Sequence, residues 1–254
     1  MKTLKLILIF LLIVFLVFVG VFLYDTLRQR FLFDANSLNS KNYSKESIAF
    51  FSDITFREGN RIRKWESDIR VELDSVSLKD SNCVVLTDQV ISILTPLIKP
   101  LKIYRVQENG NLIIHANVDS IPVNKGIGYT DVNHFNLLSE SIYKADVYTT
   151  KHYLSVLPHE MCHAIGLTHP ENRYSFYNIM GINSFIIKEH FDDPSKIKLS
   201  KYDLVLDTYD DFITFQKENI IPPQEREVIK MLYSEDIKVG LKKKYFLEKV
   251  KKMK

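Results

Sequence analysis

Residues 159–169 read HEMCHAIGLTH, and this stretch decides what fold and chemistry to expect of the chain. His159 and His163 are four residues apart, so on a helix they share one face with Cβ atoms about 5–6 Å apart. Two neutral imidazoles at that spacing can bind one metal ion. Glu160 lies beside His159, where its carboxylate can face a water on the metal without binding the metal itself.

The residues that follow supply a third ligand. Gly166 is expected to end the helix, because glycine adopts left-handed backbone without a Cβ penalty. The chain can then turn back and present His169. Three nitrogen ligands leave the fourth tetrahedral position open, which is the arrangement of a catalytic zinc site. The opposite face of the segment is apolar and predicts packing against a core; it comprises Leu154, Leu157, Met161, Ala164 and Ile165.

Some residues leave alternatives open. Pro158 directly precedes His159, so the helix either begins near Pro158 or bends there. Cys162 lies about 60° around the helix from His159, and we expect a small packed residue rather than a ligand. A disulfide between Cys83 and Cys162 requires Cα atoms within about 7 Å. A second metal site among the other histidines is possible, although surface or core roles are the simpler interpretation for His115, His134, His152 and His190.

The head of the chain is strongly apolar. Residues 6–24 read LILIFLLIVFLVFVGVFLY, in which only Gly20 lies outside the apolar set. At about 1.5 Å per residue this run nearly spans a ~30 Å hydrocarbon core. It is longer than the apolar region of a cleavable signal peptide, and no A-x-A-like site follows it. We therefore predict an uncleaved signal anchor over residues 1–30. Basic residues flank both sides of it, so the positive-inside rule gives little bias in orientation.

Composition and charge bound the rest. A hydrophobic content of 46% excludes a disordered chain, and two cysteines cannot build a disulfide scaffold. The net charge of +3 combines +3 in residues 1–30, −7 in residues 31–236 and +7 in residues 237–254. An acidic body without aromatic and basic interleaving argues against a nucleic-acid partner. The sequence leaves the oligomeric state unknown.

We divide the chain into an anchor, a tether over residues 31–60, a domain over residues 61–236 and a basic C-terminal helix over residues 237–254. Within the domain, Ser200 and Asp203 resemble a capping box at a helix start, and Pro222 with Pro223 separates that helix from the next. The other elements expected in the domain are a strand over 69–74, a helix over 83–98, strands over 101–106 and 111–118 joined by a hairpin turn at 108–110, and a strand over 141–149.

The sequence of the C-terminal segment allows two interpretations. Ile237, Leu241 and Tyr245 recur every four residues with lysines between them. This pattern predicts a docked amphipathic helix with a solvated basic face. The alternative is attraction to an anionic surface such as lipid headgroups or envelope polymer.

Residues 159–169 resemble the metzincin clan of zinc endopeptidases, because they match its H-E-x-x-H-x-x-G-x-x-H signature at every fixed position. Asn178-Ile179-Met180-Gly181 resembles the clan's Met-turn, with Met180 beneath the metal. The resemblance implies an α+β fold, with a mixed twisted sheet, covering helices, an active-site helix and a helical C-terminal subdomain. It also implies Zn2+, an extended peptide substrate along an edge strand, and action outside the cytoplasm. No tyrosine closely follows Met180, so an added tyrosine ligand is not expected.

These observations predict a membrane-anchored zinc endopeptidase that acts on a peptide or protein substrate. His159, His163 and His169 would bind zinc, Glu160 would be the general base, and Gly166 and Met180 would support the site. Residues 182–187 could line an apolar substrate pocket or belong to the core. The alternative functions are a non-catalytic zinc-containing binding module of the cell envelope and a scaffold that acts through its anchor and tail.

Overall fold

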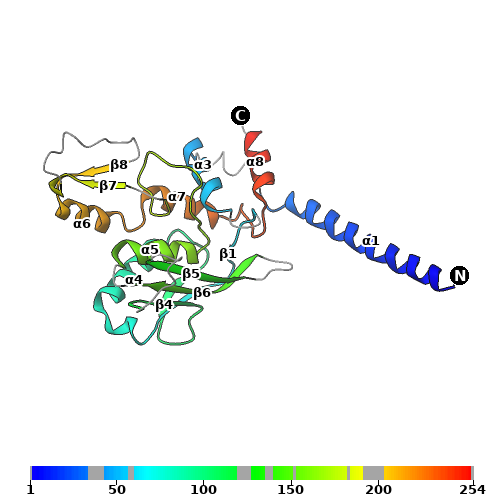
Figure 1. Ribbon diagram of the computed structural model, residues 1–254, viewed down its shortest axis with the longest axis horizontal. Helices are drawn as coiled ribbons and strands as arrows, with labels where there is room; N and C mark the ends of the chain where they lie inside the picture. The colour runs from blue at the N-terminus through cyan, green and yellow to red at the C-terminus, as the bar shows by residue number, and fades with distance from the viewer. Residues whose placement is uncertain are drawn as a thin grey trace.

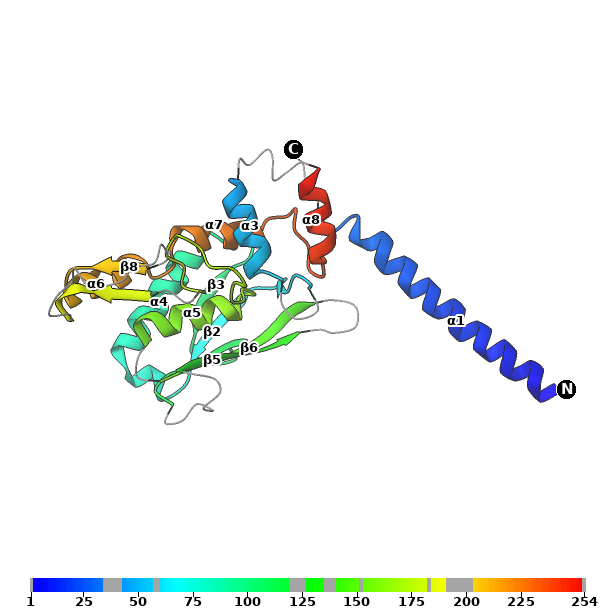
Figure 2. The ribbon, with the colours of Figure 1, turned by 45° about the horizontal axis from the view of Figure 1, so that its top comes forward.

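The computed structural model describes residues 2–33, 43–56, 60–118, 127–134, 140–150, 153–181, 184–190 and 203–252. Its overall form is a mixed α/β body with one long apolar helix at the N-terminus. Helix α1 (Lys2–Gln29) projects away from the body, and its C-terminal end lies beside helix α8 (Lys243–Lys251) (Figure 1, Figure 2). Helix α1 is long and apolar enough to cross a membrane.

The body is built on a six-stranded, mostly parallel sheet with the order β1-β6-β4-β2-β3. Strand β5 pairs antiparallel with β6. The strands are β1 (Lys64–Trp65), β2 (Ile69–Leu73), β3 (Ile103–Val106), β4 (Leu112–His115), β5 (Gly128–His134) and β6 (Ser141–Thr149). In β2 the side chains of Ile69, Val71 and Leu73 are buried, as their alternation predicts.

The hairpin predicted at residues 108–110 is wrong. Strands β3 and β4 both pair parallel with β2, one on each side of it, so the link between them crosses β2. The backbone N–H of Gly110 donates to Oε2 of Glu72 over 2.7 Å. A Cβ on Gly110 would lie 2.4 Å from the Cβ of Glu72. Glycine is therefore needed here because two backbone segments approach closely, and the same residue type misleads a local turn prediction.

Helices α4 (Ser81–Leu94) and α5 (Tyr153–Ala164) lie side by side against the sheet (Figure 1). Helix α5 begins five residues before Pro158, so Pro158 lies inside the helix. The alternative that the helix starts near this proline is wrong. Cys83 on α4 and Cys162 on α5 are both buried free thiols, and no disulfide joins them.

Part of the segment predicted as a tether is packed into the body instead. Helix α3 (Lys45–Ile54) begins at Ser44, whose side chain accepts from the N–H of Ser47. Phe50, Phe51 and Ile54 are fully buried in the core. Helix α3 lies against α7 (Pro223–Leu232). The region is rich in polar residues, and the apolar face of α3 extends over less than three helical turns. Hydrophobic periodicity over so few residues does not identify a helix.

The C-terminal third begins with a parallel pair of strands, β7 (Ser184–Ile187) and β8 (Asp203–Leu206). The helix start predicted at Ser200 and Asp203 is wrong, because Asp203 begins β8; Ser200 lies outside the described residues. The capping box is at Thr208 and Asp211 and opens α6 (Tyr209–Glu218). Pro223 then begins α7 at a position where its missing N–H costs no hydrogen bond. The remaining short elements are η1 (Ser77–Lys79) and η3 (Lys188–His190).

Helix α8 closes the body next to the end of α1. Ile237, Leu241 and Phe246 are fully buried, which confirms that the C-terminal segment is docked. The helix begins at Lys243 rather than at residue 237, because the chain from Ile237 to Lys242 forms bridges to Phe33 and Arg61 instead.

Candidate metal centre

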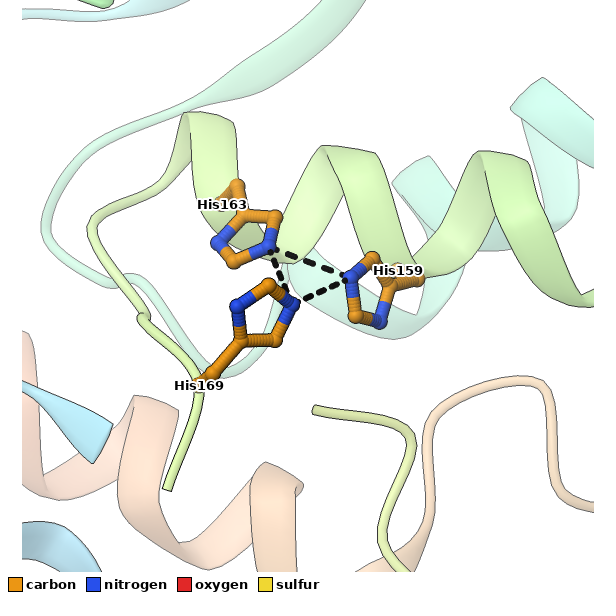
Figure 3. A group of neighbouring side chains, drawn as sticks. All are labelled: His159, His163 and His169. Atoms are coloured by element: carbon orange, nitrogen blue, oxygen red, sulfur yellow. Dashed lines mark hydrogen bonds between the residues drawn. The ribbon is translucent and has the colours of Figure 1, made fainter. Parts of the chain in front are cut away.

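The side chains of His159 and His163 on helix α5 and of His169 on the loop that follows meet at one point (Figure 3). The Nε2 atom of His159 lies 3.1 Å from Nε2 of His163 and 3.1 Å from Nε2 of His169. The third side of the triangle, between His163 and His169, is 3.3 Å. The predicted ligands are thus brought together. Among the described residues they form the one cluster of histidine, cysteine and acidic groups close enough to hold a metal ion.

Backbone carbonyls set the tautomers of two of these rings. Nδ1 of His159 lies 2.5 Å from the carbonyl oxygen of Ile179, and Nδ1 of His163 lies 2.9 Å from that of Leu167. A carbonyl can only accept, so each Nδ1 carries the proton and each neutral ring has its lone pair on Nε2. Burial lowers the pKa of His159, and the charge of His169 adds to this, although the bond to Ile179 raises it. His159 therefore favours the neutral form that binds metals.

With these tautomers, neither His159 nor His163 has a proton on Nε2 to donate across the short contact between them. Two lone pairs that face each other over 3.1 Å cannot form a hydrogen bond between neutral rings. A cation at the centre of the triangle would turn this repulsion into coordination. The donor set and the contacts therefore fit a metal ion, with all three nitrogens directed to the same point.

The helix carrying two of the ligands ends as the sequence predicts. Gly166 has a φ of 111°, and its N–H donates to the carbonyl of His163 while the N–H of Leu167 donates to that of Cys162. These two bonds form a Schellman motif. A Cβ on Gly166 would also lie 2.2 Å from the carbonyl oxygen of Arg63. Both the left-handed backbone and the close contact require glycine at this position.

Segments distant in sequence hold the turn and the loop that presents His169. The indole N–H of Trp65 donates to the carbonyl of Ala164, and the hydroxyl of Tyr233 donates to that of Ile165. These bonds satisfy carbonyls at the end of α5. The N–H of Thr168 donates to the carbonyl of Ile54 over 2.7 Å, so α3 contacts the residue next to His169.

The predicted Met-turn lies beside His159. Its Ile179 carbonyl is the acceptor for the His159 ring, and Met180 is fully buried. A Cβ on Gly181 would lie 2.3 Å from Oδ1 of Asn178, which shows how tightly the turn closes. The sequence predicts that this turn lies near the metal site, and in the structure its backbone carbonyl orients one of the candidate ligands.

Glu225 on α7 lies beneath the same turn and was not predicted. Its side chain is fully buried, and Oε1 accepts from the N–H of Met180 over 3.5 Å. Burial raises the pKa of Glu225 to about 8, although hydrogen bonds from its own N–H and those of Met180 and Ile179 lower it. A signal existed in the sequence, because Glu225 shares a helical face with Val228, Ile229 and Leu232, where an acidic residue is unusual.

Glu160 is held by strand β5. The carboxylate is nearly buried at 5% exposure, and the hydroxyl of Thr130 lies 2.7 Å from its Oε2 and 2.8 Å from its backbone carbonyl. A Cβ on Gly128 would lie 2.9 Å from Oε1 of Glu160 and 2.5 Å from a methyl of Val156. The strand can thus approach α5 because it has glycine at one position and a hydroxyl donor two residues later. Neither residue was predicted, since this contact spans 30 residues and two elements.

A cavity of about 350 Å³ opens beside the histidines. Phe185 from the segment 182–187 lines it, and its ring packs against Tyr177 and Phe212 with centroids 5.5 and 4.9 Å apart. Phe185 therefore lines the cavity, and it is half-buried and does not belong to the buried core; residues 182–183 lie outside the described part. The residues that line the cavity include Gly128, Val156, His159, Glu160, Tyr177 and Phe185.

The residues that the sequence argument discounted lie apart from the centre. Cys162 is fully buried, burial raises the pKa of its thiol well above the usual range, and its sulfur is not among the atoms that converge at the centre. His115 contacts Asp74 over 3.0 Å and Asp146 over 3.3 Å on the sheet. His190 is exposed. His152 and the side chain of His134 lie outside the described residues.

Comparison of the chain with models of known protein families and with curated protein sequences finds no match. The geometry of the site and the residues that form it therefore carry the functional argument.

Proposed function

We propose that the chain is a membrane-anchored zinc endopeptidase that resembles the metzincins. The observation that carries this proposal is the convergence of three Nε2 atoms within 3.1 to 3.3 Å of one another, next to a nearly buried glutamate on the same helix. Metal ligands alone would fit a structural site. A carboxylate that lines the adjacent cavity is not needed by a structural site, and a hydrolytic site uses it as a general base.

The spacing of the nitrogens suits zinc. In a tetrahedral site with zinc–nitrogen bonds of roughly 2.0–2.1 Å, ligand nitrogens lie about 3.3 Å apart. The contacts between His159, His163 and His169 are 3.1, 3.1 and 3.3 Å. Three such ligands would leave one position directed toward the cavity. When bound there, zinc would act as a Lewis acid and lower the pKa of water toward about 7.

The chain's own residues supply the rest of the reaction. Glu160 would accept a proton from the attacking water and pass it to the leaving amine. Thr130 orients the carboxylate by its hydrogen bond to Oε2. Among the described strands β5 pairs only with β6, so an extended peptide can pair with its other edge. Such a peptide would pass beside Gly128 and Glu160.

The contacts at the end of α1 support an anchor that stays attached. Gln29 and Phe33 are buried in the body at 0% and 2% exposure. The side chain of Gln29 donates to the carbonyl of Gly240 over 2.9 Å and accepts from the N–H of Lys242 over 2.8 Å. Removal of α1 would break these contacts. We propose an outward-facing body on the strength of the metzincin resemblance, and a reporter fused after Lys254 that works only in the cytoplasm would contradict it.

The test uses the full-length chain in detergent, loaded with zinc and incubated with a peptide library. Wild type and the control variant Glu108→Ala, which changes an exposed glutamate, should cleave peptides and bind about one zinc per chain. Glu160→Ala should keep the zinc and lose cleavage by a factor of about 10² to 10⁴. Unchanged cleavage in Glu160→Ala contradicts its role as the base. Zinc binding without turnover in wild type would favour the binding module instead.

A further inference from the structure

The end of α1 is fixed to the C-terminal segment by side chains from both. Asp25 pairs with Nζ of Lys242 over 2.5 Å and with Nη1 of Arg61 over 3.4 Å. The ring of Phe33 packs on that of Phe246 with centroids 5.0 Å apart. The helix is therefore braced against the body and not joined to it by a free linker, and α8 lies beside its end in both ribbon views (Figure 1, Figure 2).

Position along α1 places this junction at the level of lipid headgroups. The apolar run ends at Tyr24, and the helix rises about 6 Å from Asp25 to Gln29. The polar region on each side of a ~30 Å hydrocarbon core is about 5–7 Å thick. Groups that contact residues 25–29 would therefore lie among headgroups. Tyr24, which ends the apolar run, is 63% exposed, and tyrosine is enriched at this depth.

Exposed positive charge gathers at the same place. We define the basic collar as Arg30, Lys238, Lys244, Lys251 and Lys252, all of which are exposed. Lys244 and Lys251 are seven residues apart and share a face of α8 with the exposed Leu247. The segment 237–254 contains eight lysines and one glutamate, while the body carries −7. The positive charge is thus concentrated where the membrane would lie.

We propose that the basic collar binds anionic phospholipid headgroups of the leaflet from which α1 emerges, and so holds the body against the bilayer. This inference rests on α1 being a membrane anchor and does not depend on peptidase activity. Anionic headgroups match the charge of the collar, and juxtamembrane lysines are attracted to anionic leaflets. The structural bracing of α1 matters here because it fixes the height and the direction of α8 relative to the membrane.

The experiment uses the full chain inserted in vesicles that are isolated by flotation. Because Cys83 and Cys162 are buried, a fluorophore can be attached selectively to Leu247→Cys on the exposed face of α8. The probe is a phosphatidylcholine with a nitroxide on its headgroup, which quenches a fluorophore that it contacts. Vesicles contain phosphatidylcholine alone or with about one third phosphatidylglycerol, and we expect roughly twofold or greater quenching in the anionic vesicles. This increase should disappear at about 1 M NaCl, where the Debye length is about 3 Å.

Two matched pairs of variants distinguish an effect of the basic collar from an effect of the net positive charge of the chain. Lys244→Gln with Lys251→Gln should abolish the increase. Lys79→Gln with Lys217→Gln should keep it, because these exposed lysines lie on η1 and α6, away from the end of α1. Equal quenching in neutral and anionic vesicles would overturn the proposal, and so would an equal loss in both pairs of variants. Peptide cleavage is not a readout, so failure here leaves the proposed enzymatic function unaffected.

Discussion

At the junction of α1 and α8 the amide of Gln29 uses both of its ends inside the chain, whereas at the candidate metal centre the Nε2 atoms of His159 and His163 point at one another. The junction is complete without an external group. At the candidate centre, the contact between His159 and His163 cannot be a hydrogen bond between neutral rings with these tautomers. Buried polar groups are normally satisfied within a protein. The difference indicates that the junction serves structure, and that the three histidines are arranged so that they could hold a metal ion.

If the junction is purely structural, breaking it should cost stability and leave the site intact. Gln29→Ala would leave the N–H of Lys242 without its acceptor and remove a donor from the carbonyl of Gly240. We expect a loss of about 1–3 kcal/mol in the free energy of unfolding, measured by denaturant titration in detergent. Zinc content and peptide turnover in the native state should not change.

Gln107→Ala is the control for this measurement, because Gln107 is exposed and directly follows strand β3, which is distant in sequence from α1. It should change stability by less than about 0.5 kcal/mol. A Gln29→Ala variant that loses zinc while still folded would break the distinction between the two regions.

A second prediction concerns the site, where Thr130 donates to Glu160. Thr130→Val keeps the shape of the side chain and removes the hydroxyl, so we expect kcat to fall about tenfold while zinc content stays the same. Thr130→Ser should restore most of the rate because it returns the donor. Steady-state kinetics on one cleaved peptide measure both. Equal rates for the Val and Ser variants would mean that Thr130 contributes packing and not orientation.

A third prediction concerns pH and Glu225. Burial raises its pKa from the usual 4.5 to about 8, so between these values the folded chain keeps a proton that the unfolded chain releases. Stability contributed at this position is present below about pH 4.5, is lost as pH rises toward 8, and then levels off. Wild type should therefore lose stability relative to Glu225→Gln between pH 5 and 8. Denaturant titrations of both chains measure this difference, and a difference that grows in favour of wild type would contradict it.

The sequence predicted features that depend on local spacing. The helical positions of His159 and His163, the left-handed exit at Gly166 and the strand over 141–149 each follow from a periodicity or a backbone preference. The three metal-ligand candidates were found for the same reason, because all lie within eleven residues. Local rules suffice where one short segment builds the feature.

The features that the sequence missed depend on contacts between distant segments. Gly110 indicates a hairpin turn by sequence, but β3 and β4 both pair with β2, so the link that contains Gly110 crosses over β2. The sequence of helix α3 predicts a tether, but in the structure its aromatic residues are buried and the helix packs against α7. Thr130 gains a role only because β5 lies against α5. In each case the partner, and not the residue itself, decides the outcome.

The most direct test of the central claim is X-ray absorption at the zinc edge of the full chain loaded with one equivalent of zinc. We expect three nitrogen ligands and one oxygen at roughly 2.0–2.1 Å, and loss of this signal in His163→Ala. The oxygen corresponds to the open position on the cavity side. A sulfur ligand at about 2.3 Å, or a fourth protein nitrogen that closes the site, would contradict it.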